Sequence, residues 1–351
     1  MATMAQAIRM ALAYGEQHLG VTDIFGEDVG PPLGGVFTCT QGLKTAWNSP
    51  LDERGIVGAA IGLALAGQKP VAEIQFADYI FNTIDLLKLG GNFTWSSGGE
   101  FNVPMVLMTT VGSGIHGSIY HSHSIESIAT HLPGWKVVYP CTPLDAYGLM
   151  ISSLKEPNPV MFLECKALLR TKGKERIPGE PDDDKILRDM IDAPLGDRTH
   201  WKPRWPELTD FTVPIGKAKL CREGSHATVV SYGRTLPLCV EAADALASEG
   251  IRYDVIDLRS LMPFDWEMIA ASIRKTGRVL FVNEDTEITN FGEHLLRRAI
   301  EEFFYEVQVA PRLLAGKHVP GIGMAPTLED ASVPQGKDIL SAMRELATER
   351  A

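Results

Sequence analysis

The feature that most constrains this chain is the alternation of short β-rich runs with helical patterns along both of its halves. Strands separated by helical crossovers pair mainly in parallel, which is the pattern of α/β proteins. The predicted strands are Thr22–Gly26, Pro70–Gln75, Pro104–Thr109, Lys136–Tyr139, Val160–Leu163, Ala227–Tyr232, Tyr253–Leu258 and Arg278–Asn283. The alternation therefore predicts an α/β protein, although no internal sequence repeat accompanies it.

The helices are marked by their end signals as well as by their periodicity. Thr142 can cap a helix that has Pro143 in its first position and Asp145 near the positive end of its dipole. The start of the chain, from Met1 to Met10, also has a helical pattern. In the second half we expect helices that end at Glu249-Gly250 and that span Asp265–Lys275 and Phe291–Phe304.

The length of 351 residues is too great for one typical core and suits two domains. We predict a first domain over residues 1–175 and a second over residues 214–351. Between them, residues 176–213 are rich in Pro, Asp, Lys and Trp without sustained periodicity, which indicates a linker or insertion. We expect one short helix there, around Lys185–Ile191, and the acidic run Asp182–Asp184 is most simply a solvated turn or a helix start.

Composition and charge narrow the functional classes. A net charge of −11 argues against nucleic acid and anionic membrane surfaces as partners, and no apolar run is long enough to insert into a membrane. The five cysteines are widely spaced without a Cys-x-x-Cys pair, which indicates reduced thiols. No signal-peptide layout or transit peptide is visible. We therefore expect a cytoplasmic protein, or one of the mitochondrial matrix if its source is eukaryotic.

A carboxylate, Glu53, stands before a run of small residues that extends from Gly55 to Gly67. A helix with so little side-chain bulk can pack closely against another backbone or against a flat ligand. A carboxylate at such a helix start is usually only a cap. From its neighbours alone, Glu53 is therefore either a capping residue or a ligand-binding carboxylate.

A second polar segment, Glu73-Ile-Gln-Phe-Ala-Asp-Tyr79, follows directly on a predicted strand. In open α/β sheets, ligands bind outside the carboxyl ends of the strands, so polar residues there are good functional candidates. The alternative interpretation of Gln75–Tyr79 is a strand end with a buried aromatic pair.

A third segment contains His116, His121 and His123 within a stretch rich in Gly and Ser. Histidine is a common zinc ligand, but His-x-His without a third ligand at a known spacing is a weak zinc motif. Imidazoles on a loop suit proton transfer near neutral pH, and a surface loop that merely contains histidines is the alternative. The chain has neither a Gly-x-Gly-x-x-Gly fingerprint nor a Walker phosphate loop.

Taken together, these segments resemble a known family. The matching motifs, in chain order, are Gly26-Glu-Asp-Val-Gly30, Gly35-Val-Phe, Leu51-x-Glu53-x-Gly-Ile-Val-Gly58, Glu73-Ile-Gln-Phe-Ala-Asp-Tyr79, Tyr120-His-Ser-x-Ser124, Pro133-Gly-x-Lys-Val-Val, Asn158-Pro-Val and Val255-Ile-Asp-Leu-Arg259. Over nearly its whole length the chain resembles the β subunits (E1β) of thiamine-diphosphate-dependent 2-oxo acid dehydrogenases of the pyruvate and branched-chain types. The resemblance implies two doubly wound α/β domains, a pyrimidine-binding transketolase-like domain followed by a transketolase C-terminal-like domain.

The resemblance implies a role for each matching residue. Glu53 matches the glutamate that hydrogen-bonds the aminopyrimidine ring of thiamine diphosphate and favours the tautomer in which the cofactor can act as a base. Leu51, Gln75 and Tyr79 match positions that line the same aminopyrimidine pocket. His121 matches the histidine that assists decarboxylation and acyl transfer to lipoamide, as proton donor and electrostatic stabiliser.

Some positions depart from the family pattern. His123 and Ile125 stand where the family usually has Gln and Pro, which bears on the choice of substrate. The resemblance also implies a structural potassium ion in the region of Asn158, held largely by backbone carbonyls. In that region Glu156 takes the place of the family's aspartate, and Met108 takes the place of a common arginine.

The resemblance implies partners as well. The family holds the cofactor's diphosphate through Mg²⁺ with a Gly-Asp-Gly…Asn motif on the α subunit, and this chain has no such motif. We therefore expect an E1 α subunit, an α2β2 heterotetramer with thiamine diphosphate at the α/β contact, and a lipoyl acyltransferase (E2) that docks on the second domain. The stretch 178–212 is longer than is usual in the family, and is either a docking element or a surface elaboration.

Two other functions stay open at this point. One is the C-terminal half of a split transketolase-like enzyme, which would share the fold and the glutamate, although Gln75–Tyr79 and Tyr120–Ser124 favour the dehydrogenase. The other is a non-catalytic scaffold subunit, which would require none of Glu53, Tyr79 and His121.

Overall fold

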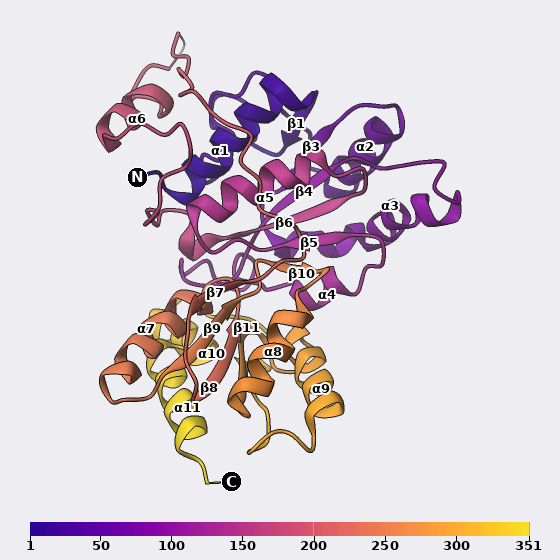
Figure 1. Ribbon diagram of the computed structural model, residues 1–351. Helices are drawn as coiled ribbons and strands as arrows, with labels where there is room; N and C mark the ends of the chain where they lie inside the picture. The colour runs from indigo at the N-terminus through magenta and orange to yellow at the C-terminus, as the bar shows by residue number, and fades with distance from the viewer. Residues whose placement is uncertain (199, 351) are drawn as a thin grey trace. The chain divides into compact units, whose positions relative to one another are not determined.

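The computed structural model describes residues 1–198 and 200–350. By their contacts, these residues form two compact units (Figure 1). Unit 1 comprises Met1–Thr110 and His131–Ile215, and unit 2 comprises Val111–Thr130 together with the chain from Gly216 onward. The segment Val111–Thr130 therefore makes most of its contacts with the second half of the chain. The domain boundaries at 175 and 213 stay predictions.

Unit 1 is built on a parallel sheet whose strand order reverses at the first strand of the chain. Its strands are β1 (Asp23–Gly26), β2 (Ala46–Asn48), β3 (Pro70–Ile74), β4 (Val106–Val111), β5 (Lys136–Val138) and β6 (Val160–Cys165). They lie in the order β5-β6-β4-β3-β1-β2, so that β2 is on one side of β1 while β3 and β4 are on the other. Ligands bind at such reversals in open α/β sheets.

The helices of unit 1 include those that the sequence predicts near Met1, Glu53, Thr142 and Lys185. They are α1 (Met4–Tyr14), α2 (Glu53–Leu65), α3 (Ile84–Ser96), α5 (Pro143–Lys155) and α6 (Asp184–Ile191), with short non-α turns at Gly15–Leu19, Ala77–Thr83 and Lys166–Leu168. α1 starts at a capping box of Thr3 and Gln6. The hydroxyl of Thr142 accepts a hydrogen bond from the Asp145 amide at the start of α5, as predicted.

The strand predictions for unit 1 are confirmed, with one shift. The strand predicted over Pro104–Thr109 spans Val106–Val111 instead. β3, β4 and β6 are buried at every position, as parallel strands covered on both faces require. At the strand reversal, a Cβ on Gly26 would lie 2.3 Å from the carbonyl oxygen of Glu73, so only glycine allows this close approach.

The described part of residues 176–213, predicted as a linker or insertion, belongs to unit 1. The Tyr147 hydroxyl of α5 donates to the carbonyl of Thr209 at 2.7 Å, and the Ser152 hydroxyl donates to the carbonyl of Val213 at 2.7 Å. These contacts join side chains to backbone, which explains why the segment lacks apolar periodicity. The predicted short helix is confirmed as α6, and the side chain of Asp183 accepts the Lys185 amide at its start.

Unit 2 contains a second, mostly parallel sheet. Its strands and helices are α4 (Glu126–Thr130), β7 (Lys219–Arg222), β8 (Ala227–Ser231), α7 (Thr235–Ser248), β9 (Tyr253–Asp257), β10 (Ser260–Met262), α8 (Trp266–Thr276), β11 (Val279–Thr286), α9 (Phe291–Phe303), β12 (Arg312–Gly316), α10 (Pro326–Ser332) and α11 (Gly336–Thr348). The sheet order is β12-β11-β8-β9-β7, with β7 antiparallel at one edge. The three strands and three helices predicted for this half are confirmed.

The structure bears on the length of the apolar helices and on the state of the cysteines. Every helix in the described residues is too short or too polar to cross a lipid bilayer. All five cysteines are free thiols, and all except Cys221 are buried.

Candidate active site

Glu53 occupies the first position of α2, directly after the N-cap residue Asp52, whose side chain makes no capping hydrogen bond. The side-chain amide of Asn82 donates to the Glu53 carboxylate at 3.3 Å. Arg54 fixes this arrangement, since its guanidinium donates to both carboxylate oxygens of Asp85 and, at 2.8 Å, to the carbonyl of Asn82. The half-buried Glu53 carboxylate is thereby presented at the positive end of a helix dipole.

Gln75 lies directly after β3, at the reversal of the strand order. Its side-chain nitrogen donates to the carbonyl of Glu27 at 3.0 Å and to the carboxylate of Asp28 at 3.2 Å. Glu27 and Asp28 follow β1, so the polar residues at the carboxyl ends of the two neighbouring strands meet here. The two bonds hold the amide nitrogen, and the amide oxygen of Gln75 remains an acceptor for a ligand.

Glu27, Glu53 and Tyr79 belong to one electrostatic cluster. Burial raises the pKa of Glu27, and the negative charges of Glu53 and Asp28 raise it further. Burial also raises the pKa of the Tyr79 hydroxyl, to which the charges of Asp78, Glu27 and Glu53 add. Within the described residues, the Glu27 oxygen Oε1 is buried without a hydrogen-bond partner. Perturbed acids of this kind, beside an unsatisfied buried oxygen, are typical of ligand sites.

Aromatic and apolar side chains border this cluster. The Tyr79 ring contacts Phe76 edge-on with centroids 5.9 Å apart, and Phe76 contacts Phe37 in the same manner at 6.3 Å. The predicted aromatic pair is therefore present, but only Phe76 is buried, while Tyr79 is partly exposed. Leu51, two residues before Glu53, is 81% exposed. Such rings offer a flat apolar wall to a heteroaromatic ligand.

His121 belongs to unit 2, in the segment that precedes α4. Its ring nitrogen Nδ1 lies 3.1 Å from the carbonyl of Gly117. When Nδ1 carries the proton and donates to this carbonyl, Nε2 is the basic nitrogen. His116 and Ser118 adopt positive φ angles of 57° and 67°, a backbone conformation that non-glycine residues keep only where their surroundings hold it.

Two buried carboxylates of unit 2 hold the start of the histidine segment. The Ser113 hydroxyl donates to Glu284 at 2.6 Å. The backbone amides of Gly114 and His116 donate to the two carboxylate oxygens of Glu329, each at 3.0 Å. A carboxylate that accepts two backbone amides fixes the course of a loop, so this segment is positioned before any ligand binds.

His123 lies beside Asp285 of β11. Burial raises the pKa of Asp285, while hydrogen bonds from Ser127 and the positive charge of His123 oppose this increase. His123 and Asp285 line a small cavity of about 90 Å³ in unit 2. The imidazole of His123 is therefore next to a buried carboxyl group.

The region of Asn158 contains polar groups but no metal cluster. The Thr94 hydroxyl donates to the side-chain oxygen of Asn158, and the carboxylate of Glu156 forms an ion pair with Lys136. Within residues 1–198 and 200–350, no group of three or more His, Cys, Asp and Glu side chains is arranged to hold a metal ion. Because Lys136 already neutralises Glu156, a potassium ion here would depend on carbonyl oxygens, and it stays a prediction.

The structure thus brings together Glu53, Gln75 and Tyr79 in unit 1 and places His121 in unit 2. Sequence reasoning assigned no role to Glu27 or Asn82, although both contribute to the arrangement around Glu53. Glu27 could have been found as a candidate because it immediately follows a predicted strand, where ligands bind in open α/β sheets.

Comparison with known proteins matches the two halves of the chain to two different domains. Residues 1–172 match the transketolase pyrimidine-binding domain, and residues 216–339 match the transketolase C-terminal domain. The chain is 34% identical to the 2-oxoisovalerate dehydrogenase subunit beta of Bacillus subtilis (strain 168) over 92% of each chain. It belongs to the β-subunit family of 2-oxo acid dehydrogenases. This family is transketolase-like and depends on thiamine diphosphate.

Two further relatives show the range of this family. The chain is 33% identical to the pyruvate dehydrogenase E1 component subunit beta of Acholeplasma laidlawii, over 99% of this chain and 98% of the relative. It is 30% identical to the acetoin:2,6-dichlorophenolindophenol oxidoreductase subunit beta of Cupriavidus necator, over 89% and 85%. Membership of the family therefore does not by itself fix the substrate.

A solved structure confirms the fold. A split gene transketolase, described as an inactive beta4 tetramer, is similar to this chain with a TM-score of 0.72 over 100% of both chains. The sequence identity is 19%, so the likeness concerns the fold alone. The predicted pair of transketolase-like α/β domains is confirmed.

Proposed function

We propose that this chain is the β subunit of a 2-oxo acid dehydrogenase E1 component, which with an α subunit decarboxylates a 2-oxo acid oxidatively and transfers the acyl group to lipoamide of an E2 component. The observation that carries the proposal is the grouping of Glu53, Gln75 and Tyr79 at the strand reversal of unit 1, in a chain of this family.

The residues fit the aminopyrimidine part of thiamine diphosphate. That ring requires a carboxylate for a ring nitrogen, an acceptor for its amino group and a flat apolar wall. Glu53 would provide the carboxylate for the ring nitrogen, and the free amide oxygen of Gln75 would accept a hydrogen bond from the amino group. Tyr79 and Leu51 would form the flat apolar wall. The unsatisfied oxygen of Glu27 lies in the same cluster and supports a ligand with hydrogen-bond donors.

The bound cofactor would supply the electron sink for decarboxylation, and the chain's own residues would set protonation and orientation. Glu53 would keep the aminopyrimidine in its reactive tautomer. His121, with Nδ1 held by Gly117, would present Nε2 to take or give a proton during acyl transfer. The buried carboxylate of Glu329 would keep the histidine segment in place.

The proposal requires an α subunit, because this sequence has no Gly-Asp-Gly…Asn motif to bind Mg²⁺ and the diphosphate. We propose that α supplies both, within an α2β2 heterotetramer that receives lipoyl groups from E2. The names of the relatives support an α partner, since they are β subunits. The split transketolase and the scaffold receive less support, because the former rests on a similarity of fold at 19% identity and the latter leaves Glu53, Tyr79 and His121 unexplained.

The test is an activity assay of the complex of this chain with its α subunit, thiamine diphosphate and Mg²⁺. A panel of pyruvate, 2-oxoisovalerate, acetoin and ketose phosphates would be compared by reduction of 2,6-dichlorophenolindophenol and by ketol transfer. We expect at least one 2-oxo acid to be oxidised, with no activity when either subunit is omitted. Ketol transfer between sugar phosphates without oxidation of any 2-oxo acid would overturn the proposal.

A further inference from the structure

The inserted segment 178–212 forms a cavity with the loop that follows β1, and this cavity includes none of the proposed catalytic residues. Its volume is about 700 Å³, and its walls include Pro31, Pro32 and Leu33 of the loop and Trp201 of the insertion. It therefore has the size of a small-molecule site and a largely apolar wall.

Gly42 has no side chain, which allows the insertion to pack against the loop at this cavity. Gly42 has a φ of +80°, and a Cβ there would lie 2.8 Å from Pro203 and 3.0 Å from Trp201. The two rings therefore rest directly on the backbone of Gly42. Any side chain at this position would both strain the backbone and displace the rings.

A second cavity of about 310 Å³ adjoins the first and shares Gln41, Ala193 and Arg198 with it. Arg170 and Arg188 also line this second cavity. The two cavities together thus present an apolar end and a basic end.

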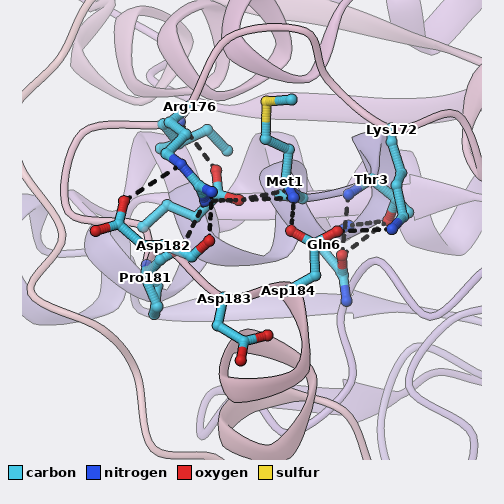
Figure 2. A network of polar contacts seen from close by, with 12 residues as sticks. Met1, Thr3, Gln6, Lys172, Arg176, Pro181, Asp182, Asp183 and Asp184 are labelled. Atoms are coloured by element: carbon cyan, nitrogen blue, oxygen red, sulfur yellow. Dashed lines mark hydrogen bonds and ion pairs between the residues drawn. The ribbon is translucent and has the colours of Figure 1, made fainter.

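The carboxylates of the basic end are already neutralised. Asp184 pairs with Lys172 and with the amino group of Met1, contacts that Figure 2 shows at the start of α6. Asp192 pairs with the buried guanidinium of Arg9. Of the three carboxylates that line the two cavities in the described residues, Asp184 and Asp192 are therefore paired with other cations, and Asp197 lies next to Arg198 in the first cavity.

Three guanidinium groups that line the second cavity are not engaged by these carboxylates. In the described part of the chain, Arg170, Arg188 and Arg198 form no ion pair. Arg170 has only a 3.5 Å contact with the Thr38 hydroxyl, and Arg198 donates to the carbonyl of Pro194 at 3.2 Å. Three cations around one cavity, in a chain of net charge −11, favour an anion at that position.

Buried hydrogen bonds fix Gln41 and Ala193, which line both cavities. Arg9 is 1% exposed and donates to the side-chain oxygen of Gln41 at 3.1 Å. The same oxygen accepts the backbone amide of Ala193 at 3.1 Å. Because Gln41 and Ala193 border both cavities, this network joins α1, the loop and the insertion into one preformed surface.

We propose that the two cavities form a single binding site for a small amphipathic anion, an organic carboxylate or phosphate ester with an apolar body. Arg170, Arg188 and Arg198 bind the anionic group, because guanidinium forks match carboxylate and phosphate oxygens. The apolar body lies between Leu33 and Trp201. This site is separate from the Glu53 site and does not depend on the proposed function.

The test is isothermal titration calorimetry on the full-length chain with four probes that share an octyl group. Octanoate and octyl phosphate distinguish the two kinds of anion. Octanol carries no charge, and octyltrimethylammonium carries a positive charge. We expect one anion per chain, with octanol bound at least tenfold more weakly and the ammonium compound not bound.

Substitutions separate the two ends of the site. Arg188→Gln should weaken the anions about tenfold, whereas the matched change Lys185→Gln on the exposed part of the same helix should leave their affinity unchanged. Leu33→Asp should weaken octanoate and octyl phosphate alike. Circular dichroism would establish that each variant is folded.

The proposal is overturned if neither anion binds, if octanol binds as tightly as the anions, or if Arg188→Gln and Lys185→Gln behave alike. It is also overturned if the α subunit displaces the probe from the chain, because the cavity would then be part of a subunit interface. The readout is binding, so its failure leaves the proposed catalytic function intact, and loss of that function would leave this site intact.

Discussion

The side-chain amide of Asn82 donates a hydrogen bond to the carboxylate of Glu53 at 3.3 Å, and Arg54 holds the backbone of Asn82 in place. Asn82→Leu should therefore reduce turnover by the complex with the α subunit about tenfold, since a hydrogen bond to a charged group contributes about 1.5 kcal/mol or more. Steady-state kinetics with saturating thiamine diphosphate would measure the change. Asn92→Leu on α3 is the matched control, and equal activity of the two variants would contradict this role of Asn82.

Tyr79 is expected to act through its ring. Burial and the charges of Asp78, Glu27 and Glu53 raise the pKa of its hydroxyl, so the phenol is neutral at physiological pH and carries no charge toward the cofactor. Tyr79→Phe should keep thiamine diphosphate affinity within about twofold, whereas Tyr79→Ala should weaken it at least tenfold through loss of the aromatic wall. Cofactor titration of the complex measures both. A large loss in Tyr79→Phe would assign the binding to the hydroxyl instead.

Arg9 and Asp192 connect the insertion to α1. The guanidinium of Arg9 is buried, and burial lowers its pKa, an effect that Asp192 opposes. Asp192→Ala would leave a buried cation without its partner, and should lower the free energy of unfolding of unit 1 by about 2 kcal/mol. Thermal and urea unfolding would show this loss. Asp189→Ala, a change of an exposed carboxylate on α6, the helix that ends just before Asp192, should have little effect, and equal losses would refute the coupling.

Buried carboxyl groups in the core of unit 1 should make its stability depend on pH. Burial raises the pKa of Glu73 to about 7, and burial together with Glu73 raises the pKa of Glu164. Folding therefore retains a proton on Glu73 that the unfolded chain releases near its ordinary pKa of about 4.5. The contribution of Glu73 to the free energy of unfolding is therefore fully present below pH 4.5 and is lost as the pH rises to about 7.

Glu73→Gln removes this titration and keeps the size of the side chain. The unfolding free energy of the variant should fall less between pH 5 and pH 7 than that of the unchanged chain, by an amount on the order of 2 kcal/mol. Urea unfolding followed by tryptophan fluorescence at several pH values measures the difference. The exposed carboxylate of Glu100 provides the control substitution Glu100→Gln, and an identical slope for all three proteins would rule out the buried acid.

Local patterns in the sequence were sufficient for much of the fold. The strand before Gln75 and the helix after Thr142 follow from apolar runs and end signals. The edge strands β7 and β12 and the helices α10 and α11 were not predicted. β7 shows the reason, because its residues Lys219–Arg222 are only partly buried or exposed at an edge and carry little apolar pattern.

Only those parts of the candidate site that lie within a short sequence motif could be predicted from the sequence. The family resemblance proposed a cofactor role for Glu53, Gln75 and Tyr79, and the structure brings these three residues together. The contact of Glu329 with the amide of His116 joins residues 213 positions apart, and no local pattern reveals such a pair. The same reason applies to the insertion, whose hydrogen bonds to α5 depend on tertiary structure.

The central claim is that Glu53 activates thiamine diphosphate bound jointly with an α subunit, and the most direct measurement compares two single-atom changes in adjacent residues. Glu53→Gln and Asp52→Asn each remove one negative charge at the start of α2. We predict that both variants assemble with the α subunit, that Asp52→Asn keeps 2-oxo acid oxidation within about twofold, and that Glu53→Gln lowers kcat at least a hundredfold. Normal turnover by the Glu53→Gln complex would contradict the account.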